Sequence, residues 1–440
     1  MNPAIVELND SEVRVARGPE IVLRSPGFAV AKHKELLLGE IAAQQCRLNP
    51  RAVYDRFWYR LNQDPITNPV ANVRHHADLA HAHLLAIHQQ SGRPEHVIFA
   101  VPGNYQNEQL ALLLGLAAAT PFKAVGLVDA AVAAVAACAG EGEYMHVDIH
   151  LHKTILTQVR VSDRVTREGV QVIDGAGLSA MVDTCAWAIA DLFIKQSRFD
   201  PQHLPETEQA LYNQIHACLQ RLRNGPETML AIDYQQVQHQ VRITSAMLAD
   251  ALQNHYRRII TAIPSGMDCL VSDRVSLLPG FRQQIRCAGI LAETCVFQGC
   301  RTHVSLIRSS DGGPALPFVT TLPAAASPLI QTATESPSSR TAVKPRQQDR
   351  VTHILHNNRA WPLGPGRIYL SAIGGAPLTG PNGSQCCVYS IHGRTEITAE
   401  SATGIFLNGQ QLAAPAALVP GDRLGFAGTD TGYTFIYVQG

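Results

Sequence analysis

The sequence predicts two folded parts, a long α/β region of two layered halves and a smaller all-β domain behind it. Strands alternate with helices through residues 3–308, a pattern typical of parallel sheets covered by helices. Six prolines lie within residues 309–350 among Ser, Thr, Ala and Gly, a composition that favours a linker. Residues 351–440 hold short alternating apolar runs between Gly, Pro and Asn turns, which favours β-structure.

In the first region, apolar runs and Ala-rich segments follow one another in a regular order. The expected strands are residues 4–6, 13–16, 96–101, 124–128, 144–149 and 155–161, and the expected helices are 108–119 and 130–139. The first two strands surround the polar turn Asn9-Asp10-Ser11, and the last two form a hairpin. No internal repeat is visible. Two such layered halves fit a bilobal domain with a central cleft.

The composition excludes several classes of protein. The chain has 440 residues, 46% of them apolar and 16% charged, so it can bury large cores and is not a disordered chain. Lys and Arg number 36, as do Asp and Glu, and a net charge of 0 gives no bulk attraction to nucleic acid or anionic membranes. With no visible signal peptide or spanning apolar run, we expect a cytoplasmic protein without nucleic-acid binding or membrane insertion. Its ten cysteines are not needed as disulfide staples.

Three segments in order resemble the nucleotide-binding domain of the heat-shock-70 chaperones, within the bilobal actin-like ATPase fold. The segments are residues 35–61, 97–137 and 144–161. The second begins VIFAVPGNYQNEQ and ends VDAAVAAVAA, which is similar to the family's VPAYFNDAQR and INEPTAAALAY. The resemblance covers most of residues 3–308. It implies an α/β bilobal fold that holds ATP between two hairpins.

The resemblance also implies where ATP would bind, and this chain departs from the family pattern there. The first hairpin, DLGTT in the family, is Glu7-Leu8-Asn9-Asp10-Ser11, in which Asp10 adds negative charge at the phosphate position. The second, DLGGGT in the family, runs from Asp148 to Lys153 without the glycines that let backbone N–H groups approach a phosphate. Phe57 stands at the place of the catalytic lysine, and the adenosine glycine pair is missing from residues 270–274.

Three carboxylates that would surround a magnesium ion are retained, at Glu7, Asp129 and Asp148. A carboxylate can also persist as a turn or cap residue. The lost motifs predict a pseudo-ATPase without a cofactor. The alternative is an active ATPase that binds ATP or ADP with Mg²⁺, with Arg56 or Lys153 in place of the missing lysine. Its nucleotide and Mg²⁺ site would comprise Glu7, Asp10, Ser11, Arg56, Asp129, Asp148 and Lys153.

The C-terminal region contains the segment GIFLNGQQLAAPAALVPGDRLGFAG at residues 404–428. It is similar to the forkhead-associated (FHA) sandwich that binds phosphothreonine, with its turns at Asn408-Gly409 and Pro420-Gly421-Asp422. The resemblance implies an FHA-like β-sandwich over residues 351–440. Its phosphopeptide site, if retained, would comprise Ser384, Ser401, Thr403 and Arg394. Because Ile373-Gly374-Gly375 lacks the family's arginine, a plain protein-docking sandwich is favoured over a phosphothreonine reader.

Two groups of histidines have both a metal-binding interpretation and a plainer one. His146, Asp148, His150 and His152 alternate, so on one strand their side chains would share a face and could line a Zn²⁺ or Ni²⁺ site. A polar row facing the cleft is the favoured interpretation. A helix expected at residues 73–90 carries five further histidines, which we interpret as a solvated helix face. They are His75, His76, His81, His83 and His88.

These observations predict a non-catalytic scaffold, a heat-shock-70-like core with degraded ATP motifs joined to an FHA-like sandwich. Both parts would act through contacts with other proteins, with self-assembly as one form of such contacts. The rival hypothesis is the active actin-like ATPase, whose FHA-like domain would recruit phosphorylated proteins.

Overall fold

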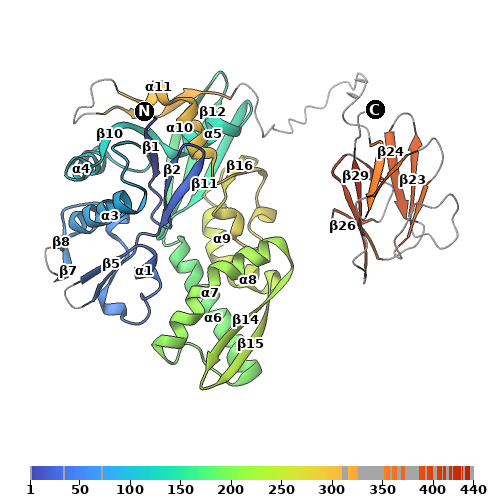
Figure 1. Cartoon of the computed structure of the whole chain (residues 1–440), viewed down its shortest axis with the longest axis horizontal. Helices are drawn as coiled ribbons and strands as arrows, with labels where there is room; N and C mark the ends of the chain where they lie inside the picture. Colours follow the sequence, from blue (N-terminus) through green and yellow to red (C-terminus); the bar gives the residue numbers. More distant parts are fainter. Residues whose placement is uncertain are drawn as a thin grey trace. The chain divides into compact units, whose positions relative to one another are not determined.

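The computed structural model of the chain divides into two compact units, Met1–Thr334 and Glu335–Gly440. The first unit contains two mixed sheets flanked by helices, and the second is all antiparallel β-structure (Figure 1). The structure describes residues 2–32, 35–70, 73–309, 316–325, 351–356, 359–363, 368–371, 386–391, 394–399, 404–408, 410–412, 416–418, 420–427, 429 and 432–436. Within these ranges no helix is both long and apolar enough to cross a membrane.

The first sheet has six strands in the order β18-β10-β9-β1-β2-β3. Its strands are β1 (Ala4–Glu7), β2 (Val13–Arg17), β3 (Glu20–Ser25), β9 (His96–Val101), β10 (Lys123–Asp129) and β18 (Phe318–Val319). The pairs β1–β9, β9–β10 and β10–β18 are parallel, whereas β1, β2 and β3 form an antiparallel meander. Strand β9 is a continuous apolar run because both faces of the sheet are covered there. The strands expected from the sequence in this half are confirmed.

The second sheet repeats the five-strand core of this topology but adds its sixth strand at the opposite edge, and the sequence did not reveal the repeat. Its order is β17-β16-β11-β12-β13-β19. The strands are β11 (Gly142–Ile149), β12 (Lys153–Val161), β13 (Arg164–Asp174), β16 (Asp268–Ser272), β17 (Cys287–Leu291) and β19 (Thr321–Pro323). Again a central strand, β11, begins an antiparallel meander on one side and pairs in parallel with β16 on the other. The expected hairpin is β11–β12.

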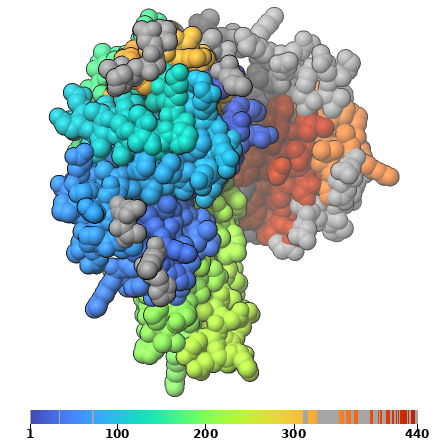
Figure 2. Space-filling view, turned by 60° about the vertical axis from the view of Figure 1, so that its left-hand side comes forward, coloured from blue at the N-terminus to red at the C-terminus, as the bar shows by residue number. Residues whose placement is uncertain are grey.

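Helices and small sheets complete two lobes, one around each large sheet. The first lobe carries α1 (Glu40–Ala43), α2 (Phe57–Arg60), α3 (His76–Gln90), α4 (Asn107–Ala118), β4 (Ala29–Lys32), β5 (Glu35–Leu38), β6 (Val53–Tyr54), β7 (Pro65–Val70) and β8 (Val73–His75). The second carries α6 (Leu178–Ser197), α7 (Pro205–Asn224), α8 (Ser245–Ala251), α9 (Gln253–Ile260), β14 (Glu227–Tyr234) and β15 (Val237–Thr244). The green residues of α6, α7, β14 and β15 project beyond the blue and cyan surface of the first lobe (Figure 2).

Helices α5 (Ala130–Cys138), α10 (Cys295–Thr302) and α11 (Val304–Ile307) link the two large sheets. Three apolar cores result, one inside each lobe and one that joins both sheets to α5 and α10. In the joining core, Ile98 of the first sheet and Leu270 of the second share a cluster with Val132 of α5 and Phe297 of α10. The Ala-rich composition of α5 follows from this position, because small side chains let neighbouring backbones approach it closely.

The histidines of α3 do not form a solvated face. The helix begins at His76, since residues 73–75 belong to β8, and its His76, His83 and His88 are buried. The Trp58 Nε1–H donates to His83 Nδ1 at 2.9 Å, and His83 Nε2 lies 2.7 Å from the Ser25 hydroxyl. The expectation was wrong for these three residues because α3 packs on the first sheet, where an indole and a hydroxyl bond both imidazole nitrogens of His83. His75 and His81 are partly exposed.

Part of the segment expected as a linker, residues 309–350, is folded. Strand β18 pairs with β10 of the first sheet, and β19 pairs with β13 of the second. Leu322 is fully buried between its neighbours, and Phe318 packs against the core of the first lobe. These apolar side chains explain why this stretch orders despite its prolines.

The second unit is built from two antiparallel sheets around a small core. One has the order β21-β20-β29-β28-β25-β26 and the other β22-β23-β24-β27. Their strands are β20 (His353–His356), β21 (Arg359–Pro362), β22 (Ile368–Leu370), β23 (Cys386–Ile391), β24 (Arg394–Ala399), β25 (Ile405–Leu407), β26 (Gln410–Gln411), β27 (Ala416–Ala417), β28 (Arg423–Phe426) and β29 (Gly432–Ile436). Asn408 has a left-handed backbone (φ 52°), and its side-chain amide donates to Asp422. The expected all-β character is confirmed.

Candidate functional site

The two hairpin turns predicted to hold phosphates bind directly to each other. The side-chain amide of Asn9, in the β1–β2 turn, donates to Asp148 Oδ2 at 2.9 Å and to the Ile149 carbonyl at 3.0 Å. In the opposite direction, the Leu151 N–H of the β11–β12 turn donates to Asp10 Oδ1 at 2.8 Å. The Ser11 hydroxyl donates to Asn9 Oδ1 in its own turn at 2.7 Å and has a longer contact, 3.5 Å, with the Ile149 carbonyl of the other hairpin. The two turns therefore satisfy many of each other's polar groups, although Asp10 Oδ2 and Asp148 Oδ1 are buried without a hydrogen-bond partner.

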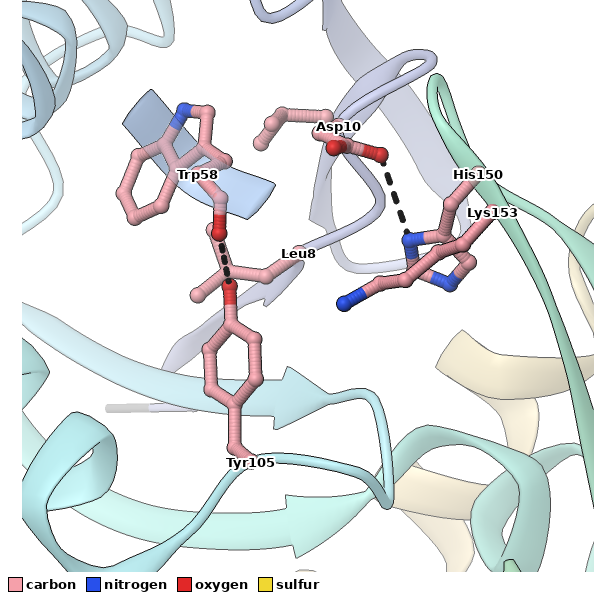
Figure 3. Close-up of a pocket in the computed structure, with 7 residues that line it drawn as sticks. Leu8, Asp10, Trp58, Tyr105, His150 and Lys153 are labelled. Carbon is pink, nitrogen blue, oxygen red and sulfur yellow. Dashed lines mark hydrogen bonds and ion pairs between the residues drawn. The ribbon is translucent and has the colours of Figure 1, made fainter. Parts of the chain in front are cut away.

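Asp10 is buried beside His150, with Oδ1 3.3 Å from the imidazole Nδ1 (Figure 3). Burial would raise the pKa of the Asp10 carboxyl, but the bond to His150 and the Leu151 N–H together hold that pKa below its usual value. Lys153 lies in the same closely packed region, where burial lowers the pKa of its ammonium. Its Nζ lies 5.1 Å from the centre of the Tyr59 ring.

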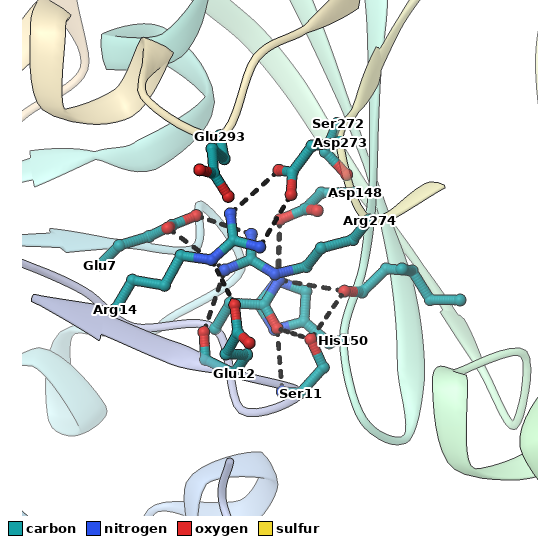
Figure 4. Close-up of polar contacts among 12 residues, drawn as sticks. Glu7, Ser11, Glu12, Arg14, Asp148, His150, Ser272, Asp273, Arg274 and Glu293 are labelled. Atoms are coloured by element: carbon teal, nitrogen blue, oxygen red, sulfur yellow. Dashed lines mark hydrogen bonds and ion pairs between the residues drawn. The ribbon is translucent and has the colours of Figure 1, made fainter. Parts of the chain in front are cut away.

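A buried arginine occupies the centre of the contact between the sheets. Arg274 follows β16, and its guanidinium makes two bonds to the Glu7 carboxylate, at 2.8 and 3.2 Å (Figure 4). Only 7% of the Arg274 side chain and 4% of the Glu7 side chain are exposed. Beside them, Arg14 makes a second two-bond contact, to Asp273, at 2.7 and 3.0 Å. Both pairs join the β1–β2 hairpin to the loop after β16.

The other two retained carboxylates also have partners within the chain. Asp129 is fully buried and caps α5 through bonds from the Ala131 and Val132 N–H groups. Its other oxygen accepts a 2.8 Å bond from Arg167. Burial raises the pKa of Asp129 in spite of that arginine.

Asp148 is compensated by several neighbours at once. Burial would raise its pKa, yet the charge of Arg274 and the imidazoles of His150 and His146 lower it to about 2. Burial lowers the pKa of His146, and the negative charges of Asp148, Asp129 and Glu7 raise it. The effect of burial is larger, so the pKa of His146 lies below its ordinary value. Arginine and histidine side chains thus stand where the resemblance would put Mg²⁺.

The proposed row of metal ligands does not share one face. Strand β11 ends at Ile149, so His150 lies in the turn and faces Asp10, while His152 bonds to the main-chain carbonyl of Asp55 at 2.9 Å. The alternation fails as a guide because the turn reverses the chain within these residues. In the part of the chain that the structure describes, no three or more His, Cys, Asp or Glu side chains are grouped to hold a metal ion.

A cleft of about 610 Å³ lies beside this network, between the first lobe and helices α6 and α7. Ser11, Arg14 and Arg274 line its floor. Arg47 crosses between the lobes, where it pairs with Asp183 at 2.5 Å and its guanidinium stacks 3.7 Å over the Tyr212 ring. The cleft expected from the bilobal pattern is present, with a pair of charged side chains across it.

The remaining predicted residues lie apart from the network or outside the described chain. Arg56 precedes α2, with its guanidinium carbon 5.9 Å from the Tyr59 ring. Ser384, Ser401 and Thr403 are not among the described residues, and of Arg394 only its place in β24 is described.

Sequence reasoning missed four residues that form ion pairs across the interface. They are Arg14, Arg47, Asp273 and Arg274. The sequence held no signal for these pairings, since Arg274 is 267 positions from Glu7 and Asp273 is 259 from Arg14. No model of a known protein family matches the chain, and no curated protein shows significant similarity to it.

Proposed function

We propose that the first unit is a non-catalytic scaffold, a heat-shock-70-like pseudo-ATPase of the actin-like fold that acts through protein contacts. The observation that carries the proposal is Arg274, whose guanidinium is bound to Glu7 and lies within the electrostatic reach of Asp148. A side-chain cation there supplies the positive charge that a nucleotide-bound Mg²⁺ would bring. The repeated sheet topology and the interlobe cleft support the actin-like assignment.

The hydrogen-bond donors that a phosphate needs are already engaged. The Leu151 N–H is bonded to Asp10, so a carboxylate takes the place of a phosphate oxygen. At the start of α6, the Leu178 and Ser179 N–H groups donate to the carbonyls of His150 and Leu151, each at 2.8 Å. A polyphosphate would have to break these bonds and approach the Asp10 carboxylate, and both steps oppose binding.

The second unit would act as a protein-docking FHA-like sandwich. Its two antiparallel sheets and its Asn408 turn support this assignment. The test for both units uses the tagged full-length chain to isolate binding proteins from the organism's own extract in nucleotide-free buffer. We expect to recover a protein partner in a stoichiometric amount. If cross-linked extracts yield neither a partner nor a self-assembled species, the scaffold proposal is wrong.

Calorimetric titration of the full chain with MgATP and with MgADP tests the pseudo-ATPase. We expect no heat of binding and no change in the thermal unfolding midpoint at millimolar nucleotide. A functional site at 100 times its dissociation constant would instead stabilise the fold by about 2.7 kcal/mol. A shift of that size would contradict the proposal.

The alternative, an active ATPase, is favoured by one observation, the cleft of about 610 Å³ with Ser11, Arg14 and Arg274 on its floor. It predicts ATP turnover that is lost in Asp148→Asn and kept in the control variant Asp191→Asn. Asp191 lies on α6, is exposed, pairs with Lys195 and does not line the cleft. Turnover that both variants retain would point to a contaminating enzyme.

A further inference from the structure

Two cysteines far apart in the sequence meet at the junction of the lobes. Cys138 is the last residue of α5, and Cys295 is the first residue of α10. They are 157 positions apart in the chain, and their sulfur atoms lie in direct contact at 2.6 Å. Both are thiols, with only 1% and 3% of their surfaces exposed. The contact therefore belongs to the apolar core that joins the two sheets.

The helices that carry these thiols lie on two of the chain's crossings between the sheets, and Thr320, between β18 and β19, makes another. The chain passes from β10 of the first sheet to β11 of the second through α5. It leaves β17 of the second sheet through α10 and α11 and later rejoins the first sheet at β18. Because α5 and α10 pack against each other on two of these crossings, we expect a change in the relative position of the lobes to move one helix against the other.

The two helices pack with their backbones in close approach along their length. A Cβ atom on Gly299, one turn after Cys295, would overlap the carbonyl oxygen of Ala133, one turn before Cys138. The contacts thus run in opposite directions along the two helices, which makes them antiparallel neighbours. The sulfur pair lies at one end of this seam, where a covalent bond would prevent the helices from sliding.

We propose that Cys138 and Cys295 form a reversible disulfide that fixes the two lobes relative to each other under oxidising conditions. The two S–H bonds break and one S–S bond forms, and two electrons and two protons leave. Hydrogen peroxide accepts the two electrons and two protons and is reduced to two waters. Alternatively, a small-molecule disulfide is reduced to two thiols after a mixed-disulfide step. The inference is independent of whether the cleft binds nucleotide.

Another cysteine pair in the same unit provides an internal contrast. Cys269 and Cys287 are partners on the adjacent strands β16 and β17. Their thiols point to separate acceptors, the carbonyls of Met267 at 3.7 Å and Gly289 at 3.6 Å. Each of these thiols is bonded to a main-chain carbonyl and not to the other thiol, which makes this pair the matched control.

The test equilibrates the full-length protein in glutathione buffers of increasing oxidising strength, then blocks free thiols and maps disulfide-linked peptides by mass spectrometry. We expect the Cys138–Cys295 link to be the first and main disulfide, and a reductant to remove it. Because the bond closes a loop of more than 150 residues, the oxidised protein should unfold at least about 5 °C above the reduced protein.

Variants separate this link from general oxidation. Cys138→Ala should lose both the linked peptide and the rise in midpoint, whereas Cys269→Ala should keep both. The wild-type titration decides the question by itself if Cys138→Ala does not fold. The proposal is overturned if no Cys138–Cys295 peptide forms in the most oxidising buffer, or if the link forms without raising the midpoint.

Discussion

The two large sheets share a five-strand core topology but differ in the edge that carries the sixth strand and in the turn that follows the central strand. In the first sheet the turn after β1 presents an amide and a carboxylate, Asn9 and Asp10. In the second sheet the turn after β11 presents a main-chain N–H, at Leu151, and an imidazole, at His150. Each turn therefore provides hydrogen-bonding groups that pair with those of the other turn, although the two sheets have similar architectures.

A few side chains of opposite charge connect the two large sheets. Arg14 and Glu7 belong to strands of the first sheet, while Asp273 and Arg274 follow a strand of the second. Each sheet therefore contributes one cation and one anion to the two central pairs. We therefore expect buried contacts to contribute far more to the free energy of unfolding than exposed ones. Three substitutions and one pH change test this expectation.

The largest effect is expected for Arg274→Met. It leaves the Glu7 carboxylate buried without a partner, which costs about 3–5 kcal/mol of unfolding free energy. Urea unfolding measures the loss. The double variant Glu7→Gln/Arg274→Met should recover part of it, because Glu7 is then uncharged while the buried Asp148 still lacks the charge of Arg274. A single variant within 1 kcal/mol of wild type would show that the pair does not hold the sheets together.

Gly299→Ala tests the helix seam between the sheets and should cost about 3 kcal/mol, since the new methyl group overlaps the Ala133 carbonyl. Gly115→Ala in α4 is the matched control, because nothing lies within 4 Å of its Cβ position. The control should stabilise the protein by roughly 0.5–1 kcal/mol through helix propensity. Equal effects of the two variants on the urea midpoint would refute the close packing.

Acid should weaken the first lobe through His83. Its folded-state pKa is lowered by burial to about 3 from an ordinary 6.5, so the unfolded chain binds more protons below pH 6.5. Stability is complete above pH 6.5 and falls as the pH drops toward 3. At pH 5 the imidazole should cost about 2 kcal/mol relative to pH 7.5. His83→Gln should lose less stability over the same interval, and identical losses would exclude this histidine as the cause.

The smallest effect is expected for Glu293→Gln. Glu293 pairs with Arg24 of the first sheet at 2.8 Å, but the two side chains are 44% and 40% exposed. Water and salt weaken such a pair, so its removal should cost no more than about 1 kcal/mol. The loss should shrink further in molar salt, whereas that of Arg274→Met should not. A loss as large as that of Arg274→Met would mean that exposure does not decide the contribution.

Local patterns predicted much of the fold but little of the site. The strand at residues 96–101 was predicted with its observed bounds, because an unbroken apolar run ends at Pro102-Gly103. The hairpin of residues 144–161 was equally visible. The repeated topology was not, since its strands have equivalent places but no shared sequence.

Partners across the interface could not be predicted, because pairing depends on where the fold brings distant residues together. Asp10 looked repulsive in sequence, yet His150 and the Leu151 N–H stabilise its charge. The histidines of α3 were misjudged for the same reason, since neutral imidazoles are tolerated in a core that offers them hydrogen bonds.

The positive charge of Arg274 also differs from that of a bound metal ion in how long it stays at Glu7. A metal ion or a nucleotide dissociates, and its departure can serve as a clock for a molecular cycle. A guanidinium belongs to the polypeptide and is neither diluted, chelated nor consumed. The junction at Glu7 is therefore complete from the moment the chain folds. In the proposed pseudo-ATPase, the persistence of this junction would depend on the lifetime of the protein and not on the supply of nucleotide.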